Sequence, residues 1–365
     1  MSTLATNAIT DASGGNTATI NGYTPTMSNM AGRNRIINGD MRIDQRNAGA
    51  SSTNIAFTVD RWNFQGTVGS KLTWGQNYGS VTPPAGFSKY LGFSTTTAYA
   101  VTSGDYFFIN QVVEGYNIAD LDWGTANAKP ATLSFYVRSS ITGTHGGSLI
   151  CGSSSYPFAY TISSANTWTQ ITISVPANTS YSPTSTTNGA GATVVFGLGI
   201  GSTYSGTAGA WSGSTLFSAT GATSVVGTSG ATFYITGVQL EEGSVATPFE
   251  HRQYGQELAL CQRYYERFGN GLVGGTRNDS TYNGDAACRF LVPKRAVPTI
   301  SYLGGTMSGI TPGVLTFNVT ALRAATPSIN GTGVQLGFNV NMGGSYPFII
   351  PNNTSVDGLE ASAEL

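Results

Sequence analysis

The sequence has little charge. Of its 365 residues, 17 are Lys or Arg and 18 are Asp or Glu, which gives a formal net charge of -1. Charged residues make up 10% of the chain, whereas an ordinary soluble domain carries roughly 25%. Binding to nucleic acid is driven by the release of counterions from phosphates, which needs an excess of Lys and Arg. The composition therefore argues against a nucleic-acid partner.

Charge is scarcest in the middle of the chain. No Asp, Glu, Lys or Arg lies between Arg138 and Glu241, so residues 139–240 depend on hydroxyl and amide groups for their solubility. Such a surface offers many hydrogen bonds and little electrostatic steering. One explanation is drift in a neutral β scaffold. The other is a surface that works outside a cell, where resistance to proteolysis and to ionic adhesion is useful.

Cysteine and long apolar runs are also scarce. Cys151, Cys261 and Cys288 are widely spaced and odd in number, which does not suit a disulfide framework or a zinc site. No run of about 18 apolar residues occurs, so we expect no membrane insertion. Residues 1–30 contain no Lys or Arg and no apolar block, and we therefore expect no secretory signal and synthesis in a reducing cytosol.

Residues for catalysis are few. The only histidines are His145 and His251, and neither accompanies a recognisable nucleophile motif. The glycine-rich stretch Phe196–Gly201 lacks the third glycine of a dinucleotide fingerprint. The sequence therefore predicts that the protein is not an enzyme and needs no cofactor.

Carboxylates could still meet in space. Glu241 and Glu242 are neighbours on a predicted strand, where they point to opposite faces and make a poor acid–nucleophile pair. If the first and last strands pair, Asp40, Asp44 and Asp60 could form a small metal site with Glu241. The alternative is that these are solvated carboxylates in turns, so the sequence leaves a structural metal undecided.

The pattern of apolar residues predicts a mainly β protein. Short runs rich in Val, Ile, Thr, Tyr and Phe recur between clusters of Gly, Pro, Asn and Ser. Trp168, Ile171, Ile173 and Val175 approach the alternation of a sheet with one wet face. The runs suit a jelly-roll β-sandwich over residues 36–250. The clearest predicted strands are Lys71 to Trp74, Tyr106 to Val113, Ala131 to Arg138, Trp168 to Val175, Thr193 to Leu198 and Thr232 to Leu240.

One segment has helical spacing. From Tyr254 to Phe268, apolar residues recur at intervals of three and four, and Gly269 follows where a glycine commonly ends a helix. We expect a short linking helix within residues 251–269. Its seam would pack on its own domain or form a small bundle on the axis of a homotrimer. The seam consists of Tyr254, Leu258, Cys261, Tyr265 and Phe268.

The two ends of the chain differ from the sandwich. Residues 270–365 are predicted to form a smaller C-terminal β domain. Residues 1–35 are polar, rich in turn residues and poor in core residues, which predicts an extended arm that is ordered only against a partner. The predicted C-terminal strands are Cys288 to Val292, Val297 to Tyr302, Val314 to Val319, Val334 to Val340 and Phe348 to Ile350.

Aromatic residues are plentiful, with 5 Trp, 18 Tyr and 17 Phe. Flat rings stack on the apolar faces of sugars, but they also fill cores. Trp62 and Trp168 are expected in the core. Aromatic residues within Gly/Ser/Thr loops are better candidates for stacking on a glycan. These candidates are Tyr156, Tyr181, Tyr204 and Trp211.

Several long phrases resemble a family of tailed-phage virion proteins. They include NRIINGDMRIDQRNAG (34–49), EGYNIADLDWGTANAKPATLSFYVRSSITGTHGGSL (114–149), TFYITGVQLEEGSVATPFEHRQYGQELALCQRYYERF (232–268) and the closing ASAEL. Members of this family are usually described as tail-fibre or other structural proteins, with a jelly roll similar to carbohydrate-binding modules. The resemblance is strong from residue 34 to about residue 300 and looser beyond, and it brings no catalytic residues.

The resemblance and the residues together predict a virion protein, assembled in the cytoplasm of a bacterial host, that adheres to host surface glycan as a homotrimer. Residues 1–35 would dock on another virion protein of the tail or capsid. Two alternatives remain, namely a purely structural head decoration or tail connector, and a polysaccharide depolymerase. The apolar residues expected to dock the arm are Ile9, Ile20, Tyr23, Met27 and Met30.

Overall fold

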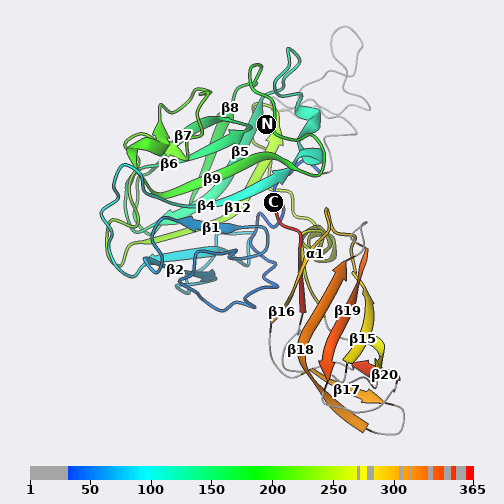
Figure 1. The fold of residues 1–365 in the computed structure, drawn as a ribbon. Helices are drawn as coiled ribbons and strands as arrows, with labels where there is room; N and C mark the ends of the chain where they lie inside the picture. The colour runs from blue at the N-terminus through cyan, green and yellow to red at the C-terminus, as the bar shows by residue number, and fades with distance from the viewer. Residues whose placement is uncertain are drawn as a thin grey trace, which may run out of the picture.

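The computed structural model describes residues 32–268, 272–277, 283–303, 307–311, 315–327, 332–340, 347–350 and 359–365. Most of the predicted arm, including the five docking residues named for it, lies outside these ranges. The described chain is mainly β, as the sequence predicts (Figure 1).

Two five-stranded antiparallel sheets form a sandwich. The first sheet has the order β1-β4-β9-β6-β7 and the second has the order β2-β3-β12-β5-β8. Apart from the consecutive pairs β6-β7 and β2-β3, neighbours in each sheet are not consecutive in sequence, as in a jelly roll. The strands of the first sheet are β1 (Asn63–Gly66), β4 (Tyr106–Glu114), β9 (Ala190–Ile200), β6 (Gly143–Cys151) and β7 (Ser154–Ile162). Those of the second are β2 (Leu72–Gln76), β3 (Leu91–Thr95), β12 (Thr232–Glu242), β5 (Ala131–Ser139) and β8 (Thr169–Val175).

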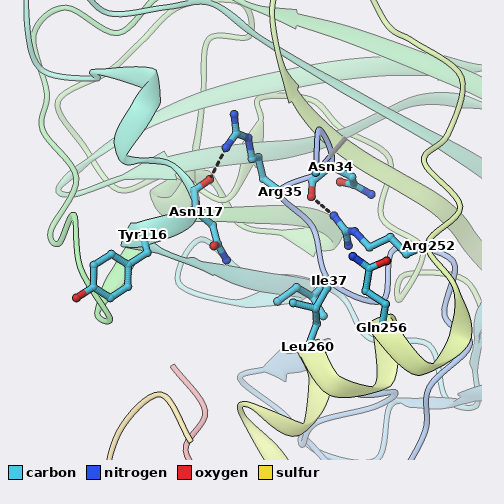
Figure 2. Close-up of a pocket in the computed structure, with 9 residues that line it drawn as sticks. Asn34, Arg35, Ile37, Tyr116, Asn117, Arg252, Gln256 and Leu260 are labelled. Carbon is cyan, nitrogen blue, oxygen red and sulfur yellow. Dashed lines mark hydrogen bonds between the residues drawn. The ribbon is translucent and has the colours of Figure 1, made fainter. Parts of the chain in front are cut away.

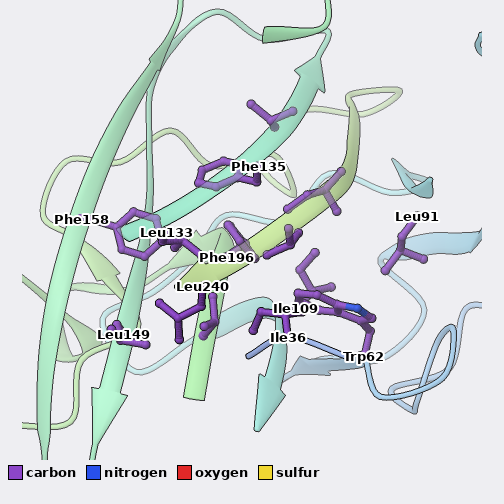
Figure 3. Close-up of a cluster of buried hydrophobic side chains, with 14 of the residues drawn as sticks. Ile36, Trp62, Leu91, Ile109, Leu133, Phe135, Leu149, Phe158, Phe196 and Leu240 are labelled. Carbon is purple, nitrogen blue, oxygen red and sulfur yellow. The ribbon is translucent and has the colours of Figure 1, made fainter. Parts of the chain in front are cut away.

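The core lies between the two sheets (Figure 3). Alternate residues of β5, namely Leu133, Phe135 and Val137, point inward because successive side chains of a strand face opposite sides. Phe135 packs against Phe196 of β9 with ring centroids 4.9 Å apart, which joins the two sheets. Trp62 is fully buried in this cluster, and its predicted core position is confirmed.

Short elements lie in the connections. The segment between β4 and β5 contains η1 (Gly115–Asn117) and η2 (Ala119–Leu121). The long connection between β9 and β12 contains η3 (Ser202–Tyr204), β10 (Ser205–Gly206) and β11 (Ser218–Ala219). This connection crosses the outer face of the first sheet, where Phe217 packs on Phe108 of β4.

The predicted linking helix is shorter than its sequence pattern. Helix α1 spans Tyr254–Gln262, and Tyr265–Phe268 forms strand β13. β13 pairs with β21 (Leu359–Ser362), so a strand from the far end of the sequence provides backbone partners that a continued helix would lose. Within the described residues, no helix combines the length and the apolar character that crossing a bilayer would require.

The prediction that the five seam residues form one stripe along a single helix is therefore wrong, because the helix ends before Tyr265. Cys261 is fully buried against Ile37 and Tyr264 of its own protomer. Tyr265 is 1% exposed and Phe268 is 8% exposed, and both belong to β13. Among the seam residues only Tyr254, at 58%, is largely exposed.

The C-terminal strands form two groups beyond α1 (Figure 1). A three-stranded sheet has the order β13-β21-β16, with β16 at Thr299–Tyr302. A closed barrel has the order β14-β15-β19-β18-β17-β20. Its strands are β14 (Leu272–Arg277), β15 (Asn283–Arg289), β17 (Met307–Thr311), β18 (Leu315–Pro327), β19 (Gly333–Val340) and β20 (Pro347–Ile350).

Many of the few charges gather where the sandwich meets α1 and β21. Arg263 donates to Glu114 at 2.5 Å, and Arg46 donates to Glu364 at 3.0 Å. The carboxylates of both pairs are almost fully buried. A buried carboxylate needs such a partner because removing a charge from water is costly. The ion pairs therefore fasten the last residues of the sequence to the sandwich.

Candidate functional site

A cavity of about 250 Å³ lies where the first described residues, η1 and α1 meet (Figure 2). Its volume is at or below the lower limit of roughly 300 Å³ typical of ligand pockets. Its lining residues are Gly32, Asn34, Arg35, Ile37, Tyr116, Asn117, Arg252, Gln256 and Leu260.

Both arginines of this cavity already have partners. Arg35 makes two parallel hydrogen bonds to the carboxylate of Asp120, at 3.0 and 2.7 Å. Arg252 donates to the backbone carbonyls of Asn34 and Ile36 and pairs with Glu257. The cavity is thus a braced joint between elements rather than a charged ligand site.

Two of the predicted glycan-stacking residues close an open side of the sandwich. Tyr156 is 6% exposed, and its hydroxyl donates to the carbonyl of Ser174 on β8. Trp211 packs between Tyr156 and Trp123, and its indole N–H donates to the carbonyl of Pro176. The ring of Tyr156 is therefore not free to stack on a sugar, and Trp211 is used mainly for packing.

The other two predicted residues contact different neighbours. Tyr181 is half-buried in the connection after β8. Its hydroxyl lies close to Gly213, since a Cβ added to this glycine would be 3.2 Å from the hydroxyl oxygen. Tyr204 stacks on Phe217 with a centroid distance of 5.1 Å and meets Tyr106 edge-on. The four residues therefore do not form one platform, and only Tyr204 joins an aromatic group on a sheet face.

That sheet face is the outer side of β1-β4-β9-β6-β7. Asn63 of β1 lies directly opposite Asn110 of β4, and Asn110 lies opposite Val195 of β9. Val112 and Thr193 form the next cross-strand pair. All of these except Val195 are half-buried. We call Asn63, Gln65, Asn110, Val112 and Thr193 the Asn face.

The two asparagines have unused hydrogen-bonding capacity. The side-chain oxygens of Asn63 and Asn110 are buried, and neither has a hydrogen-bond partner. Most buried polar groups are paired, so two unpaired oxygens on directly opposite residues need an explanation. A hydroxyl donor would satisfy each oxygen once the side chain turns toward solvent, because both oxygens are covered in this conformation.

The Asn face is bounded at both ends. At one end, Phe108 of β4 packs on Phe217 with ring centroids 4.7 Å apart. At the other end, the carbonyl of Val112 accepts a hydrogen bond from Arg61, which pairs with Glu364. Polar amides therefore lie between an aromatic group and a fixed ionic border.

The four carboxylates considered for a metal do not meet. Asp44 accepts hydrogen bonds from the backbone of Asn47 and Gly49, and Glu241 accepts from the backbone and hydroxyl of Thr247. Asp60 is buried and accepts from the backbone of Gln45. No group of metal-binding side chains forms among the residues that the structure describes. Nor are Asp60 and Glu241 solvated turn carboxylates, because both are buried.

His145 is packed in the core. Its Nε2 lies 3.0 Å from the carbonyl of Ile141, and its ring stacks on Tyr160. Burial lowers the pKa of this imidazole. His251 is exposed beside Phe87 and Phe249.

No protein-family model matches the sequence, and no curated protein matches it. Among solved structures, the chain is similar to the enzymatically active domain of tailspike protein 4 from bacteriophage CBA120. That match has 15% identity and a TM-score of 0.31, and it covers 57% of this chain and 21% of the tailspike chain.

Carbohydrate-binding modules also match. One is a family 61 module in complex with β-1,4-galactotriose, at 10% identity and a TM-score of 0.31, covering 58% of this chain and 99% of the module. Another is a family 11 module from Clostridium thermocellum in complex with a mixed-linked tetrasaccharide, at 11% identity and a TM-score of 0.26, covering 51% and 91%. With TM-scores this low, the fold is defined by the strand order of this chain itself.

Sequence reasoning missed Asn63 and Asn110. Each belongs to a different strand, and 46 other residues separate them in the chain. Only the pairing of β1 with β4 places them opposite each other. The available signal was a polar residue next to apolar ones in each strand, which by itself also fits any half-exposed strand.

Proposed function

We propose that this protein binds glycan without cleaving it, and that the Asn face is its binding surface. The protein would be a tail-fibre-like component of a phage virion that adheres to the host surface. The observation that carries the proposal is the pair of unpartnered amide oxygens on Asn63 and Asn110. A carboxamide offers both a donor and an acceptor, which suits the hydroxyl groups of a sugar.

The chemistry of the surface favours a neutral glycan. The Asn face contains no charged side chain, and the neighbouring rings of Phe108, Phe217 and Tyr204 supply apolar contact area. Hydrolysis of a glycosidic bond uses two carboxyl groups roughly 5 to 10 Å apart. The residues of the Asn face provide no such pair, so the proposed activity is binding alone.

Adhesion can be achieved by a binding site of low affinity when many copies of the site act together. Linking several sites converts later binding events into intramolecular ones, and avidity then exceeds the affinity of one site. We accordingly propose a homotrimer whose residues 1–35 dock on another virion protein. The support is the sequence resemblance to phage structural proteins and the polar, turn-rich composition of this segment.

The proposal is tested by screening the protein on a glycan array and measuring the affinity for the best neutral ligand by calorimetry. The variant Asn63→Ala/Asn110→Ala should bind that ligand roughly tenfold or more weakly, because each lost hydrogen bond contributes about 0.5–1.5 kcal/mol. Its thermal stability should not fall, since the amide oxygens have no partner in the protein. The matched control is Asn54→Ala/Asn127→Ala, which removes two exposed amides elsewhere.

Three outcomes would contradict the proposal. Unchanged affinity in the Asn63/Asn110 variant would exclude the Asn face. Absence of binding to any glycan would favour a purely structural role. Release of oligosaccharide from host capsule by the purified protein would favour a depolymerase. Immunogold labelling of intact virions tests the location independently.

A further inference from the structure

The outer face of the second sheet carries Trp168, contrary to the predicted core position. Trp168 stands one step beyond the Val137–Thr169 pair, opposite Arg138 of β5. Its side chain shares the outward direction of Gln170, whereas Ile171 and Ile173 point into the sandwich. The interval of three residues from Trp168 to Ile171 breaks the alternation and places the indole outside.

The indole is held in place. Its N–H donates to the carbonyl of Thr82 at 2.8 Å. Tyr90 meets the indole edge-on at 5.8 Å and meets Tyr234 edge-on at 5.6 Å. The segment 77–90 and strand β12 thus fix a half-buried tryptophan beside Arg138. Because the ring is already ordered, binding a ligand to it costs little additional conformational entropy.

Arg138 is unpartnered. Its Nε is buried without a hydrogen-bond partner, and no ion pair or other hydrogen bond of its guanidinium exists within the described residues. The ring of Tyr234 lies 5.8 Å from its guanidinium carbon. The other arginines of residues 32–268 each donate to a carboxylate, a carbonyl or a hydroxyl, as Arg33, Arg35, Arg42, Arg46, Arg61, Arg252, Arg263 and Arg267 do.

No acidic residue balances this charge nearby. Strands β2, β3, β5 and β8 contain no Asp or Glu, and neither does the segment 77–90. The acids of β12 are at its far end, where Glu241 accepts from Thr247 and Glu242 pairs with Lys129. The unpartnered guanidinium of Arg138 therefore gives this face a positive charge that attracts anions.

We propose that Arg138 and Trp168 form a second binding site, for a pyranose that carries a carboxylate. The guanidinium would make a two-pronged pair with the carboxylate, since its planar fork matches that group. The sugar ring would lie against the indole, and the hydroxyl of Tyr136, which already contacts Gln170 at 3.1 Å, borders the same row. The site goes beyond the proposed neutral-glycan surface and lies on the opposite sheet.

The test uses the full-length protein, oligogalacturonate and the fully methyl-esterified form of the same oligosaccharide. The acid form should bind and the ester should bind at least roughly tenfold more weakly, because hydrogen bonds between charged groups contribute more than neutral ones. Binding of the acid should weaken as sodium chloride is added.

Variants locate the site. Arg138→Gln should abolish the preference for the acid over the ester, and Arg138→Lys should keep part of it, because an ammonium retains the charge and loses the fork. Lys129→Gln removes one positive charge elsewhere and should change neither affinity by more than about twofold. Circular dichroism confirms that each variant is folded.

Three results would overturn this site. These are no detectable binding of the acid form, equal binding of acid and ester, or equal effects of Arg138→Gln and Lys129→Gln. The double variant Asn63→Ala/Asn110→Ala should leave acid binding intact. Unchanged neutral-glycan binding in this variant would therefore count against the Asn face and not against Arg138.

Discussion

Individual residues show how strongly their surroundings alter their chemistry. Asp60 is fully buried, and burial raises the pKa of its carboxyl to about 6 in spite of the attraction of Arg46. The folded protein therefore binds a proton between about pH 4 and pH 6 that the unfolded chain releases. The contribution of Asp60 to stability is thus most favourable at low pH and falls as the pH rises through this window.

The variant Asp60→Asn tests this prediction. The amide keeps an acceptor for the backbone N–H of Gln45 but cannot ionise. The difference in unfolding free energy between wild type and variant should shift in favour of wild type by on the order of 3 kcal/mol from pH 7 to pH 4. Urea denaturation across this range measures it. The exposed Asp122→Asn is the control, and a flat difference for Asp60→Asn would refute the prediction.

At the scale of elements, the last strand joins the parts of the molecule. β21 lies between β13 and β16, and the backbone N–H of Ala363 donates to the carbonyl of Tyr264. Glu364 then reaches both Arg46 and Arg61 with 7% of its side chain exposed. This strand and its ion pairs hold together segments that lie over 300 residues apart.

Glu364→Ala should lower the unfolding free energy by roughly 3–5 kcal/mol, because the buried guanidinium of Arg61 and the partly buried one of Arg46 lose their carboxylate. Hydrogen exchange in Leu359–Ser362 should become faster. Glu242→Ala breaks an ion pair in which both side chains are 39% exposed, so its cost should stay within about 1 kcal/mol. Equal effects of the two substitutions would show that the buried pair is not what fastens β21.

The Asn face has no charged side chain of its own, although the ion pair of Arg61 and Glu364 lies at its border. Ion pairs surround the joint between sandwich, α1 and β21, whereas residues 139–240 contain no charged side chain. Affinity of the Asn face for a neutral glycan should therefore change by less than roughly twofold between about 0.05 M and 0.5 M sodium chloride. Calorimetry at the two salt concentrations measures this, and a steep loss of affinity would place the neutral ligand elsewhere.

Assembly is also a property of the whole molecule. We expect sedimentation analysis to give three times the mass of one chain, and a monomer would count against the proposed trimer. Cys261→Ala should leave the oligomeric state unchanged, because Cys261 is buried within its own protomer and not on an axial seam. Dissociation of the oligomer in this variant would instead support a role of Cys261 at the trimer interface.

The sequence alone determined the class of fold and the position of most strands. Alternation of apolar residues is a local signal, and it located β5, β8 and the start of β4 because a two-layer sheet imposes a period of two on each strand. It also established that the net charge is close to zero and that residues 139–240 carry no charged side chain. It could not show that Trp168 points outward while Tyr156 lies inside. Both residues have polar neighbours in the sequence, and such neighbours occur around exposed and buried rings alike.

Only the tertiary structure decided which residues meet. Tyr265–Phe268 has helical spacing, but β21 converts it to a strand by supplying backbone partners from the other end of the sequence. Asn63 and Asn110 become a pair through the register of β1 and β4, and Arg138 joins Trp168 through the register of β5 and β8. Both sites depend on contacts between distant segments, which no local pattern of residues encodes.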